Sequence, residues 1–148
     1  MAAGLTGAVD QKDLDSNNIK DGEEAGMPGL QARLGASLID GLSLGISVAS
    51  AEEKSAGDTF DTELFAIDFQ YALADNWTIK GEAFSGSNLS DFRGGIAQGI
   101  NAGGEEIETE GGWIQVGTSC GDNWNTYVGY TMDDPDDAMG TAGGRPEH

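Results

Sequence analysis

The chain has 148 residues, of which 7 are lysine or arginine and 26 are aspartate or glutamate, so its net charge is −19 at pH 7. This balance argues against nucleic acid as a partner, because phosphate binding needs basic side chains. It is compatible with cation binding, and equally with an acidic surface that only keeps the protein soluble. Hydrophobic residues make up 38% of the chain and glycine occurs 24 times. Such a low apolar fraction occurs in disordered chains, but the apolar residues here recur at a regular period.

Catalysis by histidine or cysteine has no credible centre in this sequence. The only histidine is His148, the last residue, and the only cysteine is Cys120, so no disulfide forms within the chain. No basic segment followed by an apolar one marks a secretion signal, and no stretch of about 20 apolar residues would form a membrane helix. We therefore expect a protein that is not an enzyme and has no cofactor.

Six stretches alternate between apolar and polar residues, as strands do when they separate apolar from polar surroundings. The sequence predicts strands at residues 30–38, 42–50, 61–74, 77–85, 110–119 and 124–132, and residues 3–9 would add a seventh. In the third stretch the apolar residues recur at a period of two, which helical spacing does not explain. These residues are Phe65, Ile67, Phe69, Tyr71 and Leu73.

The quality of the alternation varies along the chain. The apolar side carries no charge through residues 30–50, 65–73 and 124–132. Phe84 falls on the polar side of the fourth stretch, and Tyr127 falls on the polar side of the sixth. The fifth stretch, residues 110–119, alternates weakly.

Short turns and long acidic connections alternate between the predicted strands. Asp, Asn and Gly favour tight hairpins near residues 39–41, 74–76 and 120–123. Long outer loops are expected near residues 10–27, 51–60, 86–106 and 133–148, and they hold most of the acidic residues. The sequence DNWT at residues 75–78 recurs as DNWN at 122–125, so a tryptophan follows two of the turns. In a membrane barrel, this position lies at the interface with water.

The polar sides of the predicted strands contain mainly Gly, Ser, Ala, Gln and Asn. Exposed strands of a soluble sandwich usually carry more Thr, Lys and Glu, whereas a water-filled lumen tolerates small polar residues. The sequence therefore predicts an all-β protein, an antiparallel up-and-down meander of six or seven strands that is part of a transmembrane β-barrel. Residues 1–148 would form a single partial barrel domain. A soluble β-sandwich is the alternative.

Two segments resemble strands of bacterial outer-membrane porins, namely NWTIKGEAFSG at residues 76–86 and GGIAQGIN at 94–101 followed by GGWIQV at 111–116. The resemblance extends over most of residues 28–135. It implies a closed barrel in the bacterial outer membrane, diffusion of small solutes and often a homotrimer. Six or seven strands are fewer than the about 8 of the smallest single-chain barrels, so we expect this chain to be a fragment of the full protein.

The polar sides of the strands carry a few charged and amide side chains that would line a pore, where they would set ion preference. They are Arg33, Asp68, Gln70, Lys80 and Glu82. A hairpin closed at Asp75 would bring Asp68 near Glu82, with Lys80 on the diagonal. A structural ladder within the wall is the alternative role.

The longest connection between well-marked strands, residues 86–106, contains Asp91 and Arg93. In porins one long loop folds inward and narrows the channel. The resemblance implies that Asp91 and Arg93 line such a constriction, facing Arg33 or Lys80. An extracellular loop with a local salt bridge is the alternative.

The oxygen ligands of a calcium-binding loop recur at a similar spacing in the N-terminal connection. They are Asp13, Asp15, Asn17, Asp21 and Glu24. The match is imperfect because Asn18 stands where such a loop has glycine. The acidic loops together would also suit divalent cations that bridge to anionic lipid.

The expected function is therefore an outer-membrane channel for passive diffusion of small hydrophilic solutes or ions, with outer-membrane lipid as its surroundings. A secreted, cell-surface calcium-binding β-sandwich used in adhesion is one alternative. A structural outer-membrane protein without conductance is the other. Reconstitution in a planar bilayer separates the three.

Overall fold

In the computed structural model, the described residues are 2–6, 16, 18–19, 26–55, 58–89, 99–101, 104–120 and 123–135. They contain seven strands: β1 (Ala2–Thr6), β2 (Gly29–Ile39), β3 (Leu42–Ser55), β4 (Asp58–Ala74), β5 (Trp77–Ser87), β6 (Glu108–Cys120) and β7 (Trp124–Pro135). No helix that would cross a membrane occurs in this part of the chain.

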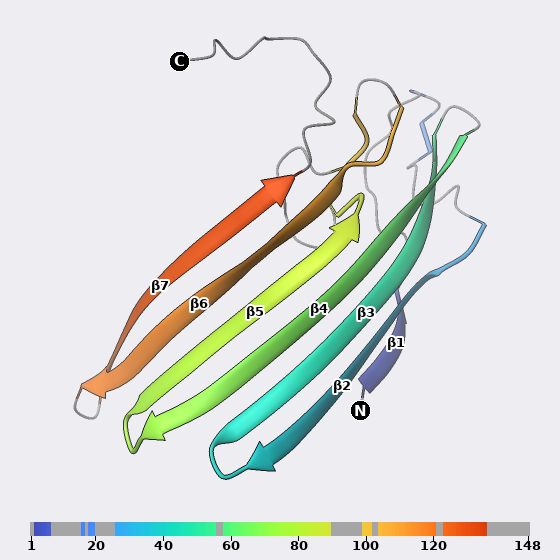
Figure 1. The fold of residues 1–148 in the computed structure, drawn as a ribbon. Helices are drawn as coiled ribbons and strands as arrows, with labels where there is room; N and C mark the ends of the chain where they lie inside the picture. The colour runs from blue at the N-terminus through green and yellow to red at the C-terminus, as the bar shows by residue number, and fades with distance from the viewer. Residues whose placement is uncertain are drawn as a thin grey trace, which may run out of the picture.

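The strands form one antiparallel sheet in sequence order, from β1 to β7. They lie side by side in a single layer (Figure 1), and each strand contacts only its neighbours in the chain. The prediction of an all-β antiparallel meander is confirmed, and all six main strands lie where the alternation placed them.

The prediction of a long loop at residues 51–60 is wrong. β3 continues to Ser55 and β4 already begins at Asp58, with Glu53 paired to Phe60 and Glu52 to Asp61. Strand pairing depends on backbone hydrogen bonds, which an acidic side chain at the end of a sheet does not prevent. The acidic composition therefore hid an extension of both strands.

The tight turns lie together at one end of the sheet, at the lower left of Figure 1. In the first, Gly41 has a φ of 80°, which favours glycine, and its carbonyl accepts a 2.9 Å hydrogen bond from the Ala72 amide. The carbonyl of Asn76, in the second turn, accepts one of 3.0 Å from the Ser119 amide. These two turns are thus hydrogen-bonded to the strand that follows their own hairpin.

Cross-strand pairing sorts the side chains into two faces, because directly paired residues point to the same side. On the apolar face, Leu34 pairs with Ile46, and Ile46 with Ile67. We define this face by its large exposed members: Leu30, Leu34, Ile39, Ile46, Val48, Phe65, Ile67, Tyr71, Trp77, Ile114, Trp124, Val128, Tyr130 and Met132. The polar face is the opposite side, where Gly45 pairs with Asp68 and Asp68 with Glu82.

Burial is reversed relative to a water-soluble sheet. On the apolar face Leu34 is 53% exposed, Phe65 47% and Val128 74%. Of the described hydrophobic residues, the buried ones are Ala51, Ala66, Leu89 and Ile107. Ala51 and Ala66 lie on the polar face, and Leu89 and Ile107 lie in the connection between β5 and β6. Within the described residues, nothing packs on the apolar face.

Three aromatic rings lie over glycines that are their direct cross-strand partners on a neighbouring strand. A Cβ atom at Gly81 would lie 2.6 Å from the Phe69 ring, at Gly111 2.7 Å from the Phe84 ring, and at Gly117 2.5 Å from the Tyr127 ring. Such pairs cover the backbone that glycine leaves bare, and they help to fix strand register.

Substitution of Gly117 by alanine is expected to lower the free energy of unfolding by about 1–2 kcal/mol, because the new methyl group displaces the Tyr127 ring. Gly35→Ala is the matched control. A Cβ atom there would be in ordinary contact, 3.5 Å from the Arg33 guanidinium. Denaturant unfolding of both variants measures the difference; equal losses would contradict the role assigned to the ring.

Candidate functional site: the polar face of the sheet

The polar face holds all five residues that the sequence assigned to a pore lining. Arg33 comes from β2, Asp68 and Gln70 from β4, and Lys80 and Glu82 from β5. The register pairs Asp68 with Glu82 and leaves Lys80 on the diagonal, as predicted for a hairpin closed at Asp75, and it also pairs Gln70 with Lys80. Asp68, Gln70, Lys80 and Glu82 therefore lie next to one another on β4 and β5, and Arg33 lies on β2, on the other side of β3.

Arg33 and Asp68 form an ion pair across the intervening strand β3. Arg33 Nη2 donates to both carboxylate oxygens of Asp68, at 2.5 and 2.6 Å. The guanidinium passes directly over Gly45, where an added Cβ would clash with both partners. The side chains are 46% and 26% exposed, and pairs so open to water contribute only about 0–1 kcal/mol. The pair therefore affects the local potential of the face more than its stability.

The connection after β5 is anchored to the same face by a buried polar cluster. Asn88 Nδ2 donates to Glu53 Oε1 at 2.9 Å and to Thr62 Oγ1 at 3.1 Å. All three residues are at most 7% exposed. Leu89 is fully buried, and its Cδ2 atom lies close to Gly86. The chain thus leaves β5 by crossing the polar face.

The chain returns to β6 from the same region. The Asn88 amide donates to the Ile107 carbonyl at 3.0 Å, and the Ile107 amide donates to the Gly99 carbonyl at 2.8 Å. Glu106 accepts a hydrogen bond from the backbone amide of Asp61, on β4 beyond the end of β5. Both described ends of the connection are therefore bonded to the sheet or to each other.

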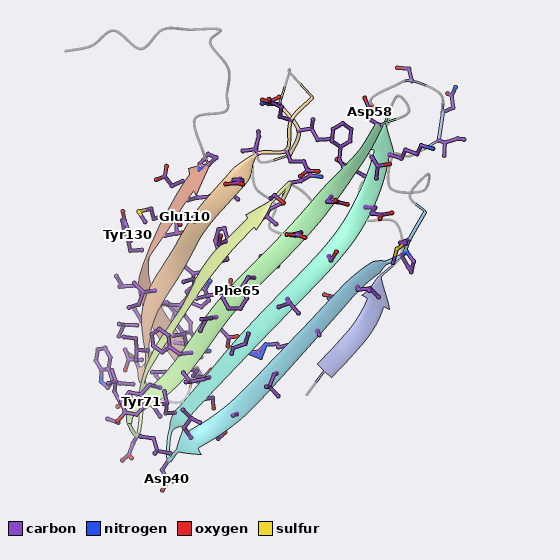
Figure 2. All side chains as sticks on the ribbon, turned by 45° about the vertical axis from the view of Figure 1, so that its right-hand side comes forward. Asp40, Asp58, Phe65, Tyr71, Glu110 and Tyr130 are labelled. Carbon is purple, nitrogen blue, oxygen red and sulfur yellow. The ribbon has the colours of Figure 1, made fainter. Side chains whose placement is uncertain are left out.

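Acidic side chains gather at the end of the sheet opposite the tight turns. Figure 2 shows Asp58 at this end and Asp40 at the other. The group comprises Glu52, Glu53, Asp58, Asp61, Glu63, Glu105, Glu106, Glu108, Glu110, Asp133 and Asp134, with Lys54 as the basic residue among them. Such a concentration of charge of one sign raises the local concentration of cations.

Several predicted site residues lie outside the described residues. These are Asp91 and Arg93 of the expected constriction, and Asp13, Asp15, Asn17, Asp21 and Glu24 of the expected calcium loop. Within the described part of the chain, no group of three or more His, Cys, Asp or Glu residues is arranged to hold a metal ion.

Gly45, Glu53, Thr62 and Asn88 were not among the site residues predicted from the sequence. Glu53 was predicted to lie in a loop, and Thr62 next to the end of that loop. The apolar residues Phe60 and Leu64 are out of phase with the run that begins at Phe65, so alternation did not mark this part of β4. Asn88 has a φ of 52°, and asparagine is one of the few residues that tolerate this conformation. That tolerance was the only local signal for its role. Nothing in the sequence marks Gly45 among 24 glycines.

No family model, curated protein or solved structure matches this chain. Function is therefore inferred from the residues and their geometry.

Substitution of Asn88 by alanine is expected to lower the free energy of unfolding by about 1–3 kcal/mol, because two buried acceptors lose the same donor. The control is Asn101→Ala. The side chain of Asn101 donates to the Glu105 carboxylate and accepts from the Glu105 backbone amide, and both hydrogen bonds are exposed, so their loss should cost about 0.5–1 kcal/mol. Denaturant unfolding compares them, and equal costs would argue against a buried anchor.

Substitution of Gly45 by alanine is expected to uncouple Arg33 from Asp68. A double-mutant cycle with Arg33→Met and Asp68→Asn should give a coupling energy of about 0.5–1 kcal/mol in the native chain. It should give none in the Gly45→Ala background, whereas Gly35→Ala should preserve it, because the methyl group fits there. A coupling that survives in both backgrounds would show that the pair does not need the gap at Gly45.

Proposed function

We propose that this sheet is a section of the wall of a β-barrel in the bacterial outer membrane, through which small hydrophilic solutes or ions diffuse passively. The apolar face contacts lipid and the polar face lines a water-filled lumen. The observation that carries the proposal is the uncovered apolar face of a single-layer sheet, opposite a face that bears an ion pair and small polar residues.

The energetic argument concerns the apolar face. Each large side chain left in water forgoes about 1.5–3 kcal/mol of burial free energy, and soluble monomers rarely expose a continuous apolar patch of this kind. Lipid removes that cost without a second protein layer. On β4 the apolar run from Phe65 to Leu73 covers nine residues, about 30 Å at 3.3 Å each, which suits a tilted strand crossing the bilayer.

The ends of the apolar face support the same orientation. Trp77 and Trp124 begin β5 and β7 on this face, beside the tight turns. Tyr71 lies near the same end in Figure 2. Tryptophan and tyrosine favour the membrane–water interface, because one part of each ring is apolar and the other hydrogen-bonds. The tight turns would then face the periplasm and the acidic end the outside.

The polar face supports a lumen. Opposite charges at Arg33 and Asp68, with Lys80 and Glu82 beside them, are groups that water rather than lipid accommodates. The connection that holds Asp91 and Arg93 has both described ends fixed on this face. That placement supports a role for these two residues in narrowing the lumen.

A membrane barrel must close, because lipid satisfies no backbone hydrogen bond. The outer edges of β1 and β7 therefore need partner strands beyond the seven described. Further strands of a longer protein or strands of other copies would both serve. Closure around the polar face leaves the apolar face outward in either case.

Tryptophan fluorescence tests the orientation of the sheet directly, since the chain has three tryptophans on two faces. In single-tryptophan variants reconstituted into vesicles, with the other two replaced by phenylalanine, acyl-chain-brominated lipid should quench Trp77 and Trp124 strongly and Trp113 weakly. Aqueous iodide should show the opposite order. Trp113 lies on the polar face, paired with Glu82 and Thr131. Vesicles of unbrominated lipid are the control, and equal quenching of all three would refute the orientation.

Planar-bilayer recording of the same reconstituted protein then separates the functions. Stepwise conductance supports the channel. Lipid quenching without conductance supports a structural membrane protein. A chain that stays monomeric in buffer without detergent, and melts at a higher temperature with calcium, supports the secreted β-domain and would overturn the proposal.

A further inference from the structure

We draw no further inference here: the strongest candidate, the group of acidic side chains at the end of the sheet opposite the tight turns, is a concentration of like charge alone, and nothing else in the described part of the chain indicates which ligand it would bind.

Discussion

The constraint on which every other feature depends is the alternation of apolar and polar side chains between the two faces of a single-layer sheet. In a sheet of this kind each residue belongs to one of two environments, and its neighbours in the chain belong to the other. Leu34 and Ile67 are on one side because Arg33 and Asp68 are on the other. The large apolar side chains are exposed, while the residues that are buried, such as Ala66 and Leu89, lie on the polar side. A sheet sorted in this way is most stable where its apolar face contacts an apolar medium and its polar face contacts water.

Small residues on the polar face determine what the larger ones can do. Gly45 lets the Arg33 guanidinium pass over β3 to reach Asp68, and Gly111 and Gly117 let rings from β5 and β7 lie on β6. In each case a side chain interacts across a strand that contributes no Cβ at the point of contact. The high glycine content, which by composition alone is typical of flexible or disordered chains, here forms a surface on which charged and aromatic groups are placed by their neighbours.

The strands and the faces could be predicted from the sequence, because both follow from a period of two that is local to each segment. The register also followed where a tight turn fixed it, as with Asp68 opposite Glu82. The ends of the strands were harder to predict from the sequence. Glu52 and Glu53 read as loop by composition, although their backbone pairs with β4. The anchor at Asn88 joins residues 26 and 35 positions away, so no local pattern contains it. The passage of Arg33 over Gly45 could not be predicted for the same reason, because it depends on residues of three strands at once.

The anchor and the ion pair have different physical characters, and this difference bears on how the polar face works. Arg33 and Asp68 remain partly exposed, so water screens them and their pairing adds little to stability. The amide of Asn88 bonds inside a cluster from which water is largely removed, where loss of a partner is costly. A fixed cluster at one end of the face and a hydrated pair in its middle divide the surface into a rigid part and an adjustable part. The rigid part fixes both described ends of the connection between β5 and β6 at the polar face. The adjustable part keeps opposite charges at the surface of the polar face, where water reaches them.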